Sequence, residues 1–120
     1  MLKKTIKYTD YNGVERTEDF YFNLTKAEVT ELEISEKGRM SNMLKQLVTT
    51  NDEKKIVEIF KSIIVKSYGV KSVDGKRFIK NPEVLDDFMQ SEAYSELFME
   101  MAQDASKAEV FMNGIIPAVK

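Results

Sequence analysis

The chain has 120 residues, of which 42% are hydrophobic and 32% are charged, so it can bury a core without a metal or a disulfide. It contains no cysteine and no histidine, which excludes disulfides, thiolate and imidazole metal sites, and every catalytic mechanism that uses either residue. Eighteen basic and twenty acidic residues give a net charge of −2, too balanced to indicate a nucleic acid as the main partner. We therefore expect one domain over residues 1–120 that is not an enzyme and uses no cofactor.

No apolar run approaches the roughly 18 residues of a membrane span. The first seven residues alternate apolar and basic side chains and lack the apolar centre of a signal peptide. These features predict an intracellular protein with no membrane partner.

Residues 1–23 have the pattern of a β-hairpin. Leu2, Ile6 and Tyr8 alternate with polar side chains, which is the period of a half-exposed strand. Asn12-Gly13 is the pair that most readily forms a type I′ turn. The returning segment has an apolar face that Arg16 and Glu18 interrupt; its apolar members are Val14, Phe20 and Phe22.

After Asn23 the period becomes helical. Thr25 and Glu28 form a capping box that predicts the start of a short first helix, with a stop at Glu36-Lys37-Gly38. A second helix is expected over residues 40–48. The strongest helix follows residues 50–52 and ends at Gly69, and its apolar stripe consists of Ile56, Ile59, Phe60, Ile63, Ile64 and Tyr68.

Residues 70–81 are expected to be a connector, with Phe78 and Ile79 turned inward. Asn81-Pro82 then predicts a helix start, and Ser91 predicts another. Residues 92–113 form either one long helix or two helices with a break near Asp104, and Gly114 is the expected end. The predicted fold is α+β: an N-terminal β-hairpin, a bundle of about five helices within residues 24–114, and an apolar tail over residues 115–120.

No group of side chains indicates catalysis. Asp86 and Asp87 are adjacent on a predicted helix, where neighbouring side chains point about 100° apart, so they fit a solvated face better than a pair of catalytic carboxylates. Glycine-rich phosphate-binding loops and calcium-binding loop spacings are absent. We therefore predict no catalytic, cofactor-binding or metal-binding residues.

Charge is segregated along the chain. Residues 66–80 carry five basic side chains and one acidic one, whereas residues 81–110 carry eight acidic side chains and one lysine. The basic stretch either binds phosphate groups or lies against the acidic helices of the same chain. The second interpretation is favoured, because no aromatic side chains are interleaved with the lysines as they are in proteins that bind single strands.

Four apolar side chains near the C-terminus cannot all be buried in one small bundle unless a partner covers them or the chain folds back on itself. Met99 and Val110 fall off the inner helical stripes, and Ile115-Ile116 follows the expected end of the last helix. Methionine-containing apolar surfaces suit the binding of varied helical partners. The predicted partner-binding residues are Met99, Val110, Met112, Ile115 and Ile116.

Five segments resemble the tail assembly chaperones of long-tailed phages and prophages of Gram-positive bacteria, and the resemblance as a whole runs from about residue 20 to Pro117. They are Leu24-Thr25-Lys26-Ala27-Glu28, Gly38-Arg39-Met40-Ser41, Ile59-Phe60-Lys61 to Lys66-Ser67-Tyr68-Gly69-Val70, Asp74-Gly75-Lys76-Arg77-Phe78 and Ser91-Glu92-Ala93-Tyr94-Ser95-Glu96-Leu97. These are sequence similarities and not catalytic motifs.

The resemblance implies a non-enzymatic protein that coats the tape measure protein, keeps it soluble and helps to bring tail tube subunits to it. It implies action in the cytoplasm of an infected or lysogenic host and absence from the mature virion. Self-association through the same apolar residues is compatible with this role. Two alternatives remain: a small nucleic-acid-binding regulator that uses residues 66–80, and a structural adaptor of the virion.

Overall fold

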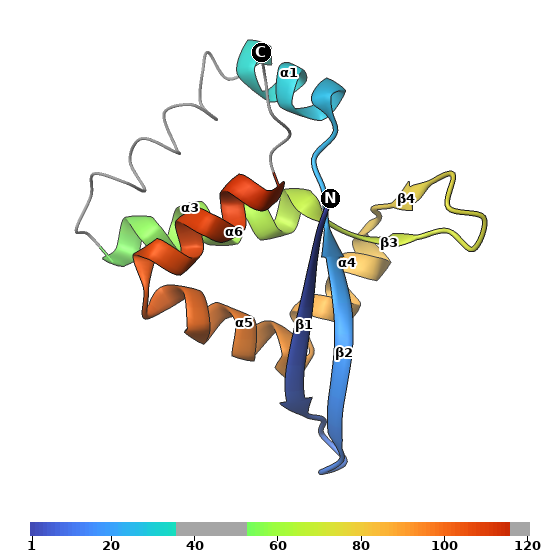
Figure 1. The fold of residues 1–120 in the computed structure, drawn as a ribbon, viewed down its shortest axis with the longest axis vertical. Helices are drawn as coiled ribbons and strands as arrows, with labels where there is room; N and C mark the ends of the chain where they lie inside the picture. Colours follow the sequence, from blue (N-terminus) through green and yellow to red (C-terminus); the bar gives the residue numbers. More distant parts are fainter. Residues whose placement is uncertain (36–52, 116–120) are drawn as a thin grey trace.

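The computed structural model describes residues 1–35 and 53–115, and this part of the chain contains four strands and five helices (Figure 1). The elements are β1 (Leu2–Thr9), β2 (Glu15–Phe22), α1 (Lys26–Ser35), α3 (Glu53–Ser67), β3 (Tyr68–Lys71), β4 (Phe78–Ile79), α4 (Pro82–Met89), α5 (Glu92–Ala102) and α6 (Ala105–Ile115). The predicted α+β class and the N-terminal hairpin are confirmed. The predicted second helix over residues 40–48 lies outside the described residues.

The N-terminal hairpin pairs all eight residues of β1 with all eight of β2, from Leu2↔Phe22 to Thr9↔Glu15. Its turn differs from the predicted type I′ turn. The amide of Gly13 donates to the carbonyl of Asp10 at 2.9 Å, so Tyr11 and Asn12 are the central residues, and Gly13, with φ of +80°, follows them. The Asp10 carboxylate stabilises this longer turn, because it accepts hydrogen bonds from the amides of Asn12 and Val14.

Strand alternation gives the sheet two different faces. The outer face of β1 is exposed and polar, whereas Leu2, Ile6 and Tyr8 point inward. Helices α5 and α6 pack against β1 on the inner side, and α4 packs against β3. Arg16 and Glu18 also lie on the inner face, but near the turn, where they are exposed and form hydrogen bonds to Asp10 and Tyr8 respectively.

Residues 68–79 form a second hairpin, where sequence predicted the end of a helix and a connector. Helix α3 ends at Ser67, and Tyr68 pairs with Phe22, so β3 and β4 extend the first hairpin into a sheet of order β1-β2-β3-β4. Gly69 does not end the helix as predicted. It is needed in β3, since a Cβ there would lie 2.6 Å from the Phe78 ring and 2.8 Å from the carbonyl oxygen of Ile79. The described helices therefore pack on a sheet as well as on one another.

The helix boundaries follow from capping groups. The predicted capping box is confirmed, because Thr25 and Glu28 exchange backbone-to-side-chain hydrogen bonds of 2.9 and 3.1 Å. Asn81 caps α4 through the amide of Val84 at 2.8 Å, also as predicted. Ser91 precedes α5 but does not cap it; its hydroxyl donates instead to the carbonyl of Phe88.

Residues 92–113, for which the sequence allowed one long helix or two, contain two helices. Helix α5 ends at Ala102, and the carboxylate of Asp104 accepts a hydrogen bond of 2.9 Å from the amide of Ser106 in the first turn of α6. Gly114 lies inside α6 and does not end it, since the helix continues to Ile115.

The core lies between the sheet and the helices. Phe22 from β2 contacts the rings of Phe88 on α4 and Phe111 on α6, with centroids 5.8 and 5.1 Å apart. The ring of Phe60 on α3 also contacts that of Phe111, with centroids 5.5 Å apart. The buried apolar residues are Ile6, Phe22, Leu24, Val29, Ile59, Phe60, Ile63, Ile64, Tyr68, Phe88, Ala93, Leu97, Met101, Ala108, Phe111, Met112 and Ile115.

Candidate binding surface

The five residues predicted to bind a partner fall into three groups. Met99 on α5 and Val110 on α6 are exposed, by 49% and 72%. Met112 and Ile115 are buried, with 0% and 1% exposure, so neither side chain lies on the surface of this structure. Ile116 lies outside the described residues.

The burial of Met112 and Ile115 has a simple geometric cause. Ala108, Phe111, Met112 and Ile115 occur at i, i+3, i+4 and i+7, which is the inner stripe of a helix. The sequence interpretation ended the helix at Gly114 and so placed Ile115 beyond the stripe. Because α6 continues through Gly114, Ile115 completes the stripe and packs in the core.

An apolar hollow surrounds Val110, where α6 meets α5 and the start of β1. Its volume is about 360 Å³. Its apolar lining comes from Leu2 on β1, Met101 on α5, and Val110 and Phe111 on α6, and Lys4, Glu100, Ser106 and Lys107 complete it. Three elements that are distant in the sequence therefore build one hollow.

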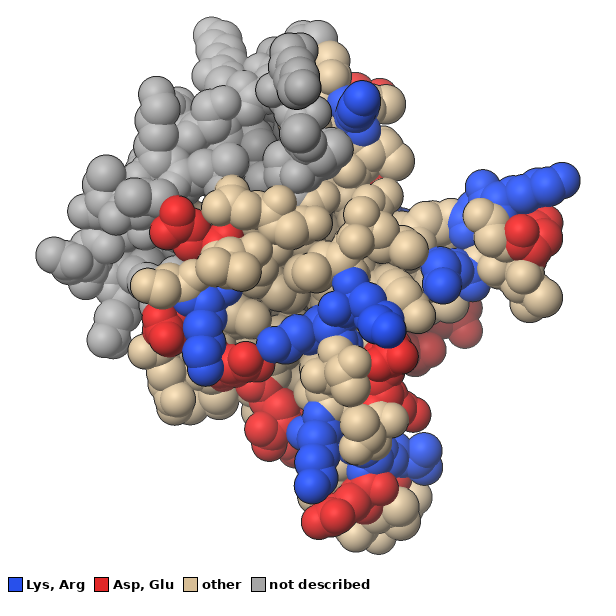
Figure 2. Space-filling model, viewed as in Figure 1, with Lys and Arg blue, Asp and Glu red and all other residues tan. Residues whose placement is uncertain are grey.

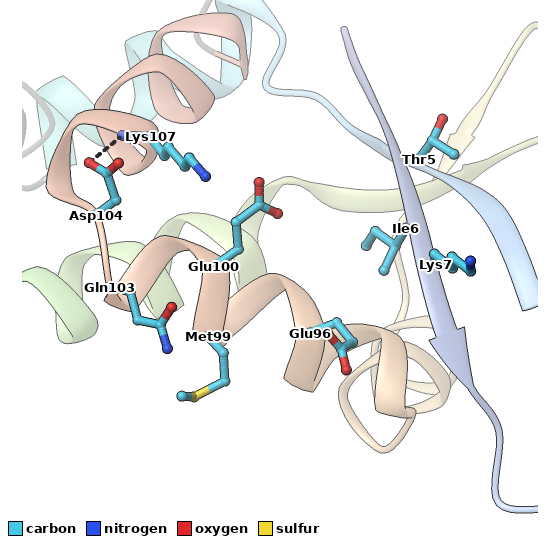
Figure 3. Close-up of a pocket in the computed structure, with 9 residues that line it drawn as sticks. All are labelled: Thr5, Ile6, Lys7, Glu96, Met99, Glu100, Gln103, Asp104 and Lys107. Atoms are coloured by element: carbon cyan, nitrogen blue, oxygen red, sulfur yellow. Dashed lines mark hydrogen bonds between the residues drawn. The ribbon is translucent and has the colours of Figure 1, made fainter. Parts of the chain in front are cut away.

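A larger, polar hollow lies beside the open edge of β1, with a volume of about 680 Å³ (Figure 3). Thr5, Ile6 and Lys7 form its strand side, and Glu96, Met99, Glu100, Gln103, Asp104 and Lys107 form its helix side. Figure 3 shows the Met99 side chain pointing away from β1, at the outer side of α5. Met99 and Val110 thus line neighbouring hollows and not one shared apolar groove.

One ion pair lies where the two hollows adjoin. Lys4 Nζ lies 3.0 Å from a carboxylate oxygen of Glu100, and both side chains are partly exposed. Glu100 and Lys107 line both hollows. The apolar hollow therefore has a charged margin, which keeps an exposed apolar surface compatible with water.

Sequence reasoning missed the contribution of β1 to this surface. Leu2 was recognised as part of a strand face, but a strand pattern does not tell which helix covers it. Lys4 and Glu100 are 96 positions apart, and only the packing of α5 on β1 brings them together.

The basic stretch over residues 66–80 is divided by the fold. Lys80 turns inward, and its ammonium lies 2.7 Å from a carboxylate oxygen of Glu28 on α1. The sequence had predicted contact with the acidic helices α4 to α6 instead. Lys71 lies over the ring of Tyr21, with its Nζ 4.3 Å from the centroid. Lys76 and Arg77 are exposed on the β3–β4 turn. Lys66 and Lys80 are half-buried, so three of the five basic side chains of the stretch are exposed.

Asp86 and Asp87 are exposed on α4, as predicted for a solvated helix face. Among the residues that the structure describes, acidic side chains nowhere gather into a group of three or more that could hold a metal ion. None of the described helices is both long and apolar enough to span a membrane.

Comparison with protein families decides what the whole chain is. The sequence model of the phage tail assembly chaperone family matches residues 1–119. The chain belongs to the phage tail assembly chaperones. This is a family of assembly factors and not a class of enzymes, and the match includes the N-terminal hairpin.

No curated protein and no solved structure matches this chaperone. The two hollows on β1, α5 and α6 are therefore interpreted from their own chemistry. An exposed valine above an apolar hollow with a charged margin is suited to hold an apolar segment of another protein.

Proposed function

We propose that this chaperone binds an apolar helical segment of the tape measure protein and keeps it soluble until the tail assembles. In the same proposal it helps to bring tail tube subunits to the tape measure, acts in the host cytoplasm and is absent from the finished virion. Membership of the tail assembly chaperones supports the general role. The resemblance described above suggests the tape measure and tail tube as partners.

The exposure of Val110 over the apolar hollow is the observation that carries the proposal. An apolar side chain of a client helix can enter a hollow of about 360 Å³ and contact Leu2, Met101 and Phe111. Burying one such side chain contributes about 1.5–3 kcal/mol, enough to matter when it is repeated along a long client.

The charged margin has a second role in this proposal. Lys4, Glu100 and Lys107 surround the apolar contact and remain accessible to water. A client covered by several chaperones would thus present charged groups in place of its own apolar side chains. That exchange is what keeps an apolar helix in solution.

The nucleic-acid alternative has less support after the fold is known. Lys80 is bound to Glu28, which leaves Lys71, Lys76 and Arg77 as exposed basic side chains of the stretch. Three cations would release few counterions and would bind nucleic acid weakly at physiological salt. For a virion adaptor, the distinguishing measurement is a search for the chain in purified particles.

Co-expression with the tape measure protein tests the proposal. The double variant Met99→Gln with Val110→Gln removes the exposed apolar groups and keeps good helix formers on α5 and α6. We expect a folded chaperone with an unchanged melting temperature but a precipitated client. The matched control is Val14→Gln with Val65→Gln, which removes two exposed apolar side chains outside both hollows and should leave the client soluble.

A client that stays soluble with the Met99 and Val110 variant would contradict the proposed surface. A client that precipitates with both double variants would show that general surface apolarity, and not this hollow, is responsible.

A further inference from the structure

The β3–β4 hairpin, residues 68–79, projects from the body of the molecule as a finger (Figure 1). Its turn is held by its own hydrogen bonds. The Ser72 amide donates to the Arg77 carbonyl at 2.9 Å, and the Arg77 amide donates to the Ser72 hydroxyl at 3.1 Å. The Asp74 carboxylate accepts from the Ser72 hydroxyl at 2.6 Å and from the Lys76 amide at 3.0 Å. The finger is thus ordered before any partner arrives, which lowers the entropy cost of binding.

The side chains at the end of the finger are exposed to solvent. Val73 is fully exposed, and Lys76 and Arg77 are exposed as well. Within the described part of the chain, neither basic side chain takes part in an ion pair. An ordered turn that presents one apolar and two basic side chains is a surface suited to an acidic partner.

An acidic surface lies next to the base of the finger. Helix α4 carries Glu83, Asp86 and Asp87, all exposed and all without an ion pair among the described residues. Figure 2 shows acidic side chains just beneath the base of the projecting finger. The rings of Tyr68 in β3 and Phe88 on α4 stack with centroids 4.4 Å apart. This contact fixes the position of the acidic helix relative to the base of the finger.

We propose that a second copy of this chain binds here, with the finger of each copy lying on α4 of the other. The two surfaces have opposite charge. The finger is basic, because it carries Lys71, Lys76 and Arg77 and one acidic residue, Asp74. Helix α4 is acidic, because it carries three carboxylates and no basic residue. Because both surfaces belong to one chain and lie side by side, a two-fold axis between two copies satisfies both contacts at once. This inference concerns self-association and does not depend on which client the chaperone binds.

Charge reversal on each side provides the test, with the mass in solution measured by light scattering over a concentration series. Wild type should have twice the mass of the 13.8 kDa chain at low salt and dissociate as salt is raised, since exposed charges are screened within about 10 Å at 0.1 M. Lys76→Glu with Arg77→Glu should be monomeric, because two acidic surfaces then face each other. The variant Asp86→Lys with Asp87→Lys should also be monomeric, because two basic surfaces then face each other.

An equal mixture of the two variants is the decisive measurement. Each finger in a mixed pair again meets an α4 of opposite charge, so the mixture should recover the dimer mass and the salt dependence of wild type. The control Lys7→Glu with Lys61→Glu lowers the net charge from −2 to −6, as the finger variant does, but alters neither surface and should stay dimeric.

Three results would overturn the proposal: a monomeric wild type at low salt, dimers that survive either reversal, or a mixture that remains monomeric. Assemblies larger than two copies would also contradict it, because they require a head-to-tail contact and not a two-fold one. The client-solubility assay is separate, so loss of one property can be distinguished from loss of the other.

Discussion

Lys80 connects three segments of the chain through one partly buried ammonium group. Its Nζ donates to the carbonyl of Asn23 at 2.7 Å, to the carbonyl of Lys66 at 3.0 Å and to the carboxylate of Glu28 at 2.7 Å. All three donors of the ammonium are therefore used. Glu28 has two roles, since its other oxygen accepts from the Thr25 amide at the start of α1. The lysine thus holds α1 to the end of β2 and the end of α3.

The pKa of Glu28 reports this arrangement. Partial burial raises the pKa, but the hydrogen bonds and positive charge of Lys80, together with the bonds from Thr25, outweigh burial, and the pKa falls below its ordinary value of 4.5. A carboxyl whose pKa is lower in the folded state stabilises the protein above its ordinary pKa. That contribution is lost as the pH falls through the folded value.

We predict that Glu28→Gln lowers the free energy of unfolding by about 0.5–1 kcal/mol at pH 7 and that this difference becomes smaller as the pH falls below the ordinary pKa of 4.5 towards pH 3. Glutamine can keep the capping hydrogen bond from Thr25 through its one side-chain oxygen, but it loses both the charge and the second oxygen that accepts from Lys80. Lys80→Met should cost more, about 1–3 kcal/mol, because two carbonyls and a carboxylate lose their donor. Urea unfolding at both pH values measures these changes. A difference for Glu28→Gln that persists unchanged at pH 3 would contradict the assigned ion pair.

Two glycines illustrate how elements approach one another in this fold. Gly69 lies in β3 where the Phe78 ring and the Ile79 backbone leave no room for a side chain. Gly114 lies inside α6, where the nearest atom to an added Cβ is a terminal carbon of Leu2, at 3.1 Å. A rigid backbone obstructs the first position, whereas the end of a flexible side chain faces the second.

We expect opposite effects when each glycine is replaced by alanine. Gly69→Ala should destabilise the protein by about 1–3 kcal/mol, because the β3–β4 pairing must open to admit the methyl group. Gly114→Ala should be neutral or stabilising by up to about 1 kcal/mol, since alanine favours a helix and Leu2 can move slightly. Thermal unfolding of the two variants side by side tests this. Equal losses would mean that Leu2 is held as firmly as a strand backbone.

Across the whole molecule, α6 separates a core face from a surface face within one turn. Met112 is buried against the core that contains Phe60 and Phe22, and Val110, two residues earlier, is exposed beside the apolar hollow. The same helix therefore contributes to stability and to the proposed binding surface through different side chains.

Substitution at the two faces should separate these roles. Met112→Ala should lower the free energy of unfolding by about 2–5 kcal/mol and Phe60→Ala by about 3–5 kcal/mol, because each leaves a cavity in the core. Val110→Ala should change it by less than about 0.5 kcal/mol. Chemical denaturation of the three variants measures the differences. A Met112→Ala protein as stable as wild type would show that α6 does not pack as described.

Local sequence patterns determined the elements whose signals involve close neighbours. The predictable features were the N-terminal hairpin, the capping box of Thr25 and Glu28, the start of α4 at Asn81 and the burial of Ile59, Phe60, Ile63 and Ile64 on α3. Each depends on residues within a few turns of one helix or within one hairpin. The match to the tail assembly chaperones also comes from sequence. Patterns of this kind recur with a period of two or 3.6 residues and need no knowledge of the rest of the fold.

The tertiary structure decided what depends on distant partners. Tyr68 had the spacing of a helical stripe, yet pairing with Phe22 places it in a strand, since backbone hydrogen bonds to an existing sheet outweigh one more helical residue. The sequence pattern predicts a helix end at Gly114, just before Ile115, but the packing of α6 on the core carries the helix through Gly114. The apolar hollow joins Leu2 to Val110 across more than one hundred positions, and no local pattern records that contact. Side-chain periodicity tells which face is apolar, whereas only packing determines whether that face is buried by the chain itself or left for a partner.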